Sequence, residues 1–191
     1  MKNSPWGKIQ YTTAIAQGVL HVDTSSHGGI KVDRKFNALM PDYLRREGGW
    51  YEEDCEWCLP FVALEEHFLC TGTPKIIEII KQEEHRRIFV SYYWSEYERF
   101  YRVILQPGES RGKAEEVWKE AHKADWQCVT AYGDWHPRVP TGMVGRACTV
   151  GGKSDGERRV FLLSAEEDHR RGSERFIPDL SRHQEISSGD M

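Results

Sequence analysis

The sequence predicts an α+β protein with a single domain, in which an antiparallel or mixed sheet from N-terminal and C-terminal strands packs against central helices. Alternating, β-branched segments lie in the first and last thirds of the chain, and helical apolar patterns lie between them. A length of 191 residues with 39% hydrophobic content suits one sizeable core. We place the domain at residues 1–185 and expect a frayed tail over residues 186–191.

The first third is predicted to form a β-hairpin or meander. Residues 19–23 alternate and are rich in β-branched side chains, and residues 29–32 follow a turn of small residues. Asp33 has a side chain suited to capping a short helix, which Pro41 should end.

The central part is predicted to be helical. A helix is expected over residues 50–70, kinked or divided at Pro60, and another over residues 74–87, where four isoleucines form an apolar face. Residues 88–105 fit either a strand or a helix, and we favour a helix. Residues 110–124 have a clearer amphipathic pattern.

The last third is predicted to form three neighbouring strands over residues 126–132, 141–150 and 158–163, separated by turns rich in glycine and proline. Ser164 followed by Glu167 is typical of the start of a helix, here a short one.

Composition excludes several classes of protein. The net charge of −4 and the absence of a basic stripe argue against direct nucleic-acid binding. No apolar run reaches the roughly 20 residues that a membrane span needs, so we expect no membrane association. Five cysteines without an export signal predict reduced thiols in a cytoplasmic protein.

One stretch is locally anionic. Between residues 47 and 74 there is no lysine or arginine, and there are seven acidic residues: Glu47, Glu52, Glu53, Asp54, Glu56, Glu65 and Glu66. Such a stretch is suited to a basic surface on a partner.

His27 stands among small residues in Ser25-Ser26-His27-Gly28-Gly29. Glycines permit tight backbone geometry or close approach of a ligand, so this imidazole is a candidate for acid–base chemistry. The alternative is that His27 only bonds a backbone carbonyl in the turn.

The densest polar and aromatic run is residues 48–57, which we expect to open the helix over 50–70. Its carboxylates Glu52, Glu53 and Asp54 suit a first helical turn. Because successive helical residues fan around the axis, one of the three should face the protein and need a partner such as Arg, His or a metal ion.

Four residues have the spacing C-x2-C…H-x2-C, namely Cys55, Cys58, His67 and Cys70. These are zinc-ligand types, but the segment between them is apolar and resembles a protein core. We therefore predict no metal site and no cofactor.

A second candidate segment lies between two predicted strands. It carries Asp134, Trp135, His136 and Arg138 on a connection bounded by prolines. Asp134 and His136 suit an orienting carboxylate and a base, and Arg138 suits an anion clamp. The alternative is a turn whose Asp caps backbone N–H groups.

Three groups of motifs together resemble a family of small proteins of unknown function from bacterial plasmids, integrated elements and bacteriophages. They are Ser4-Pro5-Trp6-Gly7 with Ser26-His27-Gly28-Gly29, residues 48–57, and residues 132–145. The resemblance implies a mobile-element setting and no particular chemistry. Cys58 departs from the family pattern, which has a small apolar residue there.

Two functions follow as hypotheses. The leading one is an accessory protein of a phage or mobile element that binds a host protein or nucleoprotein complex, of the anti-CRISPR or anti-restriction type, with binding residues Trp50, Tyr51, Trp57, Trp135 and Arg138. The alternative is a small hydrolytic enzyme with catalytic residues His27, Glu52, Glu53, Asp54, Asp134 and His136 in one cleft.

Overall fold

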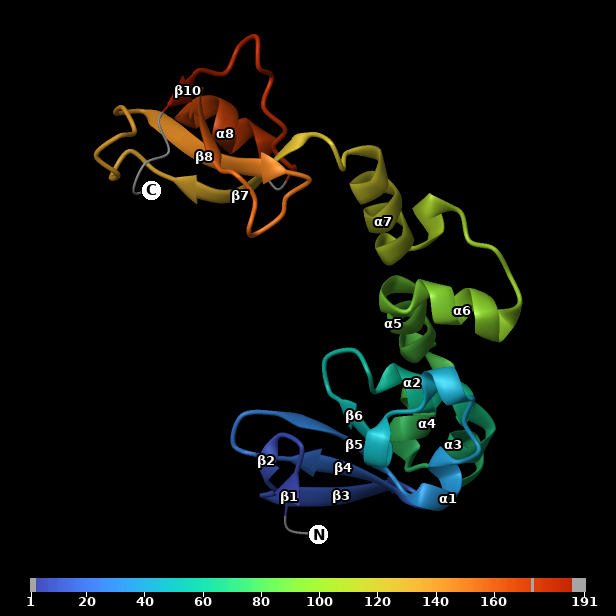
Figure 1. Cartoon of the computed structure of the whole chain (residues 1–191). Helices are drawn as coiled ribbons and strands as arrows, with labels where there is room; N and C mark the ends of the chain where they lie inside the picture. The colour runs from blue at the N-terminus through green and yellow to red at the C-terminus, as the bar shows by residue number, and fades with distance from the viewer. Residues whose placement is uncertain (1–2, 173, 187–191) are drawn as a thin grey trace. The chain divides into compact units, whose positions relative to one another are not determined.

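The computed structural model describes residues 3–172 and 174–186. The chain separates into two compact units, residues 1–116 and 117–191, and each is described here by itself. The predicted α+β class is confirmed, because helices and antiparallel sheets make up the fold (Figure 1). The N-terminal and C-terminal strands form separate sheets. The boundaries of a single domain over 1–185 stay a prediction.

The first unit is built on a four-stranded antiparallel sheet in the order of the chain (Figure 1). Its strands are β3 (Tyr11–Ala16), β4 (Val19–Asp23), β5 (Gly28–Val32) and β6 (Trp50–Glu52). The predicted meander is thus confirmed, with β3 and β6 added to it. A separate two-stranded ribbon pairs β1 (Asn3–Ser4) with β2 (Gly7–Lys8).

The first unit also contains α-helices, one between β5 and β6 and the others after β6. They are α1 (Arg34–Asn37), α2 (Cys58–Ala63), α3 (Glu65–Thr71), α4 (Pro74–Lys81), α5 (Glu84–Tyr92), α6 (Trp94–Tyr101) and α7 (Arg111–Ala121), which crosses the boundary between the units. Asp33 caps α1 as predicted, since its carboxylate accepts a hydrogen bond from the Phe36 N–H at 3.0 Å. The core of this unit includes the fully buried side chains of Val19, Val32, Tyr51, Leu59, Phe68 and Phe89.

The predicted helix over residues 50–70 is wrong in its first part. Trp50–Glu52 is a strand that pairs with β5, and a turn over residues 53–57 precedes α2. Gly49 has a φ of +71°, which starts no helix, and the pairing buries Tyr51 completely. The division falls at Leu64, between α2 and α3, rather than at Pro60.

The favoured helix over residues 88–105 is confirmed as far as Tyr101, in α5 and α6. The helix predicted over residues 74–87 is divided, because Glu83 adopts the left-handed conformation (φ 56°) between α4 and α5. None of the described helices has both the length and the apolar character needed to cross a bilayer.

The second unit holds the other four-stranded antiparallel sheet, in the order β10-β9-β8-β7. The strands β7 (Trp126–Tyr132), β8 (Met143–Val150) and β9 (Arg159–Ser164) confirm the three predicted strands, and β10 is Glu185–Ile186. Ser164 caps α8 (Ala165–Arg171) by accepting a hydrogen bond from the Glu167 N–H, as predicted. Of the predicted frayed tail, only Ile186 lies within the described residues, and it is in β10.

Candidate functional site

Three of the predicted site residues come together in the first unit. One ligand atom each from His27, Glu52 and Glu53 lies within 4.8 Å of the other two, and among the described residues this is the one such group of three or more His, Cys, Asp or Glu side chains. His27 and Glu53 are exposed and Glu52 is half-buried. We call these three side chains the His-Glu-Glu cluster.

The pairing of β5 with β6 builds this cluster. Gly29 on β5 lies opposite Glu52 on β6, and His27 immediately precedes β5. Thr24 fixes the backbone of His27, since its hydroxyl donates to the His27 carbonyl (2.7 Å) and accepts from the His27 N–H (3.1 Å). Two segments that are 25 positions apart in the chain thereby meet across one strand pair.

Two glycines make the close approach possible. A Cβ atom added at Gly28 would lie 2.4 Å from Oε2 of Glu53, so only glycine leaves room for that carboxylate where it lies. A Cβ atom at Gly29 would lie 2.3 Å from both the Trp6 ring and the Tyr51 carbonyl oxygen. The three motifs that contain Trp6, His27 and Glu52 therefore meet at a single place in the fold.

The cluster has few internal partners. The Glu52 Oε2 atom accepts a hydrogen bond from the Asp54 N–H at 2.7 Å. Over residues 3–172 and 174–186, neither the His27 ring nor the Glu53 carboxylate has a hydrogen-bonding or ionic partner. Both side chains are exposed, so a ligand can reach them from solvent without breaking a contact within the protein.

A groove with a volume of about 460 Å³ adjoins the cluster through Glu53. Its lining is largely apolar, which suits the apolar part of a small molecule. Charged and polar side chains interrupt that lining at a few positions. The lining residues are Thr13, Ala14, Ile15, His21, Gly29, Ile30, Glu53, Trp57, Phe61, Thr73, Lys75, Ile76, Ile79 and Glu84.

Other residues of the 48–57 run are structural. The buried Tyr51 hydroxyl donates to Asn37 Oδ1 (2.6 Å) and accepts from the Arg46 N–H (3.3 Å), and burial raises the pKa of this phenol. Glu56 accepts from Arg46 Nε at 2.6 Å and from the Glu52 N–H at 3.3 Å. Asp54 is exposed and contributes only its backbone N–H to the cluster. This framework holds β6 and the turn after it.

The tryptophans of the run are half-buried rather than projecting. Trp50 packs edge-on against Trp6 with ring centroids 5.7 Å apart, and Lys31 Nζ lies 4.9 Å from its ring centroid. Trp57 packs edge-on against Phe61 at 5.1 Å and lines the groove.

The four zinc-ligand types found in the sequence do not come together. Cys58 is fully buried in the core, the Cys55 thiol contacts the Tyr93 hydroxyl at 3.3 Å, and His67 Nε2 contacts the Gln17 carbonyl at 2.7 Å. Cys70 is exposed. Burial raises the pKa of the Cys58 thiol, which disfavours the thiolate that binds zinc.

The predicted site residues of the second unit lie on the connection between β7 and β8. The Asp134 carboxylate accepts from the Gly142 N–H (3.0 Å), and His136 Nδ1 accepts from the Arg138 N–H (3.3 Å). Within the described residues, no hydrogen bond joins Asp134 to His136. Trp135 is 74% exposed, and its ring lies edge-on to the His136 ring. The turn interpretation accounts for Asp134, and the roles of His136 and Arg138 stay predictions.

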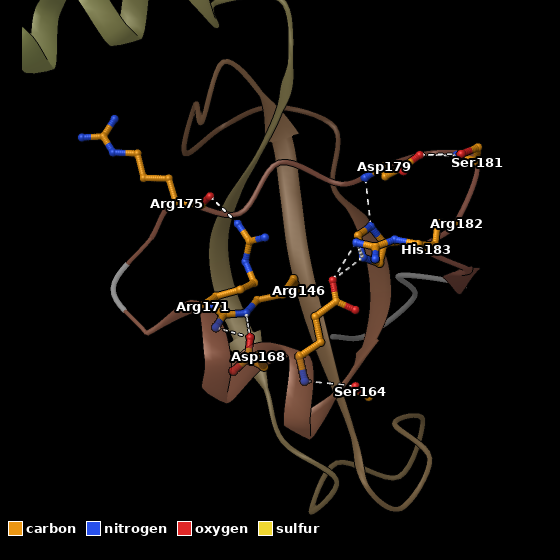
Figure 2. Close-up of polar contacts among 10 residues, drawn as sticks. Arg146, Ser164, Asp168, Arg171, Arg175, Asp179, Ser181, Arg182 and His183 are labelled. Carbon is orange, nitrogen blue, oxygen red and sulfur yellow. Dashed lines mark hydrogen bonds and ion pairs between the residues drawn. The ribbon is translucent and has the colours of Figure 1, made fainter.

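Sequence reasoning missed a polar network in the second unit, shown in Figure 2. The Asp179 N–H donates to Nδ1 of the buried His183 (2.9 Å), so Nε2 carries the proton and faces Oε1 of Glu167 at 3.2 Å. Arg182 donates to the same carboxylate oxygen at 2.7 Å. Glu167 lies 15 and 16 positions before its partners Arg182 and His183, so no local pattern in the sequence indicates these contacts. Because its groups are paired with one another, this network stabilises the fold.

A pair of cysteines lies beside this network. Cys128 on β7 is opposite Cys148 on β8, and Arg146 reaches both the Asp168 carboxylate (2.8 Å from Nε) and the Cys128 sulfur (3.8 Å from Nη1). The Cys148 thiol and then the Arg146 guanidinium lower the pKa of Cys128 to about 6, in opposition to burial. Cys128 is therefore a candidate reactive thiol, which the sequence did not indicate.

Residues 1–123 match the family model of a domain of unknown function, DUF7007. The chain belongs to the DUF7007 family. The matched residues contain the whole of the His-Glu-Glu cluster and its groove, whereas residues 132–145 of the sequence resemblance lie beyond the match. No curated protein and no solved structure matches the chain.

Proposed function

We propose that the DUF7007 domain binds a small organic molecule in the groove and hydrolyses it at the His-Glu-Glu cluster. The observation that carries this proposal is that Glu53 belongs both to the cluster and to the lining of the groove. A molecule that fills the groove lies beside Glu53, and we infer that its reactive bond reaches the neighbouring His27 and Glu52.

The chemistry of the cluster suits activation of water. Imidazole and carboxylate groups can each accept a proton from water as it attacks a substrate. The water oxygen then bonds to the carbonyl carbon of an amide or ester, and its proton passes to the cluster. The carbon–nitrogen or carbon–oxygen bond breaks, and the leaving group takes up the proton.

The groove favours a substrate that is uncharged at the reacting bond. The two carboxylates of the cluster repel phosphate groups at the reacting bond. Lys75 is the one lysine or arginine in the lining of the groove, where Glu53 and Glu84 outnumber it. The apolar side chains of Ile15, Ile30 and Phe61 suit an aliphatic or aromatic group of the substrate. An amide or ester with such a group is the substrate class that fits best.

Hydrolysis assays on a panel of amide, ester and phosphoester substrates test this function. We expect amides or esters with apolar groups to be cleaved by the native chain, and His27→Gln and Glu53→Gln to lose at least about 100-fold in rate, the usual size of a general acid–base contribution. His136→Ala measures whether the second unit takes part. Full activity of both cluster variants would contradict the proposal.

A second candidate function is the binding of a host protein or nucleoprotein complex by a phage or plasmid protein in the cytoplasm, including antagonism of a host defence system. The exposed Trp135 and the acidic surface at Glu52, Glu53 and Asp54 favour it. Affinity capture followed by reconstitution with the purified partner tests it. Trp135→Ala and the charge reversal Glu52→Lys with Glu53→Lys should weaken capture, and undiminished capture by both would count against these surfaces.

A further inference from the structure

The cluster brings two carboxylates together, those of Glu52 and Glu53, and no basic side chain of lysine or arginine within the described residues is paired with them. Other carboxylates of the same unit do have such a partner. Glu56 is paired with Arg46, and Glu65 with Arg86. Like charges held close together are stabilised by a counter-ion, so the two carboxylates favour a cation at this place.

We propose that His27, Glu52 and Glu53 bind a divalent first-row transition-metal ion, with Zn²⁺ as the best fit. This inference deepens the proposed hydrolytic function, on which the catalytic role of the metal rests. In it the three side chains would act as metal ligands, and the metal would replace them in the activation of water. The binding of the metal itself rests only on the geometry of the three side chains.

The ligand types select the metal. Imidazole suits zinc and other transition metals, whereas magnesium and calcium prefer ligand sets made of oxygen atoms alone. None of the three side chains of the cluster is a thiol. Three protein ligands with one position left for water is the arrangement of catalytic zinc sites.

The three ligand atoms need to move only slightly closer together to bind one zinc ion. Zinc bonds to nitrogen and oxygen of about 2.0–2.1 Å at tetrahedral angles place neighbouring ligand atoms about 3.3 Å apart. The three ligand atoms already lie within 4.8 Å of one another. His27 and Glu53 are exposed, so we expect a change of their side-chain rotamers to close this difference.

The surroundings hold the ligands in place. The Asp54 N–H occupies Glu52 Oε2 and leaves Oε1 for the metal, and Thr24 bonds both backbone groups of His27. Gly28 leaves the room that the Glu53 carboxylate occupies. Such supporting contacts orient metal ligands and raise the affinity of a site.

The metal would present its open position beside the groove that Glu53 lines. A water molecule bound there would have its pKa lowered to about 7 and would be a nucleophile near neutral pH. Its oxygen would bond to the substrate carbonyl carbon, its proton would pass to the leaving group, and the bond between that carbon and the leaving group would break.

Cobalt titration of the purified full chain, stripped of metal with a chelator, tests the site. We expect one Co²⁺ ion to bind per chain and Zn²⁺ to displace it. The visible absorption should be that of cobalt with a low coordination number, and it should lack a sulfur-to-cobalt charge-transfer band. His27→Gln and Glu53→Gln should each weaken binding by more than the roughly 10-fold to 100-fold that loss of a supporting contact costs. Asp54→Asn, whose side chain lies outside the cluster in the same turn, is the matched control and should bind normally.

Several results would overturn the metal site. They are the absence of Co²⁺ and Zn²⁺ binding by the native chain, binding that both cluster variants keep, and a charge-transfer band that shows thiolate ligands. Circular dichroism of each variant confirms that it is folded. Hydrolysis that depends on His27 without bound metal would overturn the metal site and leave the proposed function. Metal binding without hydrolysis would leave the site and overturn the function.

Discussion

The Glu53 carboxylate lies directly against Gly28, and a Cβ atom at Gly28 would be only 2.4 Å from it. Gly28→Ala should therefore push the carboxylate away and lower the Co²⁺ affinity of the cluster by at least about 10-fold. Stability should change by less than about 1 kcal/mol, because the closest atoms are the end of an exposed, flexible side chain and the backbone atom in reach, the Val22 carbonyl oxygen, lies 3.3 Å away. Cobalt titration and urea unfolding of the same preparation measure the two effects.

Gly29→Ala is the contrasting variant. Its Cβ atom would meet the Tyr51 carbonyl oxygen and the Trp6 ring, both at 2.3 Å, and the strand pairing holds that carbonyl in place. We expect a loss of about 1–3 kcal/mol in the free energy of unfolding, as for other overpacked positions. Equal stability of the two glycine variants would contradict this account of the β5–β6 pair.

Local patterns predicted the elements that local sequence determines. The strands β7, β8 and β9, the cap at Ser164 and the amphipathic α7 follow from periodicity and capping within a few residues. Residues 50–52 were mistaken for helix, because their strand form depends on pairing with β5, about 20 positions earlier. Strand β3 was missed because four of its six side chains are exposed and give no apolar alternation.

The sequence indicated which residues belong to the candidate site, but it did not indicate which of them lie close together. His27, Glu52 and Glu53 each stood in a segment that the sequence singled out, but their meeting depends on a long-range strand pair. Asp134 belongs to the other unit and bonds its own turn. The Glu167 and His183 pair gave no signal, since two residues 16 positions apart carry no periodicity.

The buried hydroxyl of Tyr51 gives a second stability prediction. Tyr51→Phe removes the hydrogen bond to Asn37 and leaves both the Asn37 oxygen and the Arg46 N–H short of a partner. The expected cost is about 1–3 kcal/mol in the free energy of unfolding, measured by urea denaturation. Tyr11, which is 71% exposed, supplies the control, and Tyr11→Phe should stay within about 0.5 kcal/mol of the native chain. Equal losses from both variants would contradict a special role for the buried hydroxyl.

His85 should make the stability of the protein depend on pH. Its ring is fully buried, and burial lowers its pKa below the ordinary value of 6.5, although Glu65 lies 3.3 Å away and opposes this shift. Between the two values the unfolded chain binds a proton that the folded chain does not. Stability is therefore complete above pH 6.5 and falls as the pH drops below it.

The predicted slope from one such proton is at most about 1.4 kcal/mol per pH unit. Urea unfolding at several pH values between about 7.5 and 5 should show this slope in the native chain and a smaller one in His85→Phe. His169 is exposed on α8, so His169→Phe should keep the native slope. A slope that His85→Phe leaves unchanged would assign the pH dependence to other groups. Glu65, whose pKa is also lowered from 4.5, contributes mainly below this range of pH.

Cys128 should be the most reactive thiol of the chain at neutral pH. With a pKa lowered to about 6, it is mainly thiolate at pH 7, whereas burial raises the pKa of Cys58. Iodoacetamide labelling followed by peptide mass spectrometry should modify Cys128 before the exposed Cys70, with a rate that rises around pH 6. Arg146→Gln removes a cation that favours the thiolate and should slow labelling of Cys128 at pH 6.5 while leaving Cys70 unchanged. Faster labelling of Cys70 than of Cys128 in the native chain would show that the half-buried position of Cys128 outweighs its ionisation.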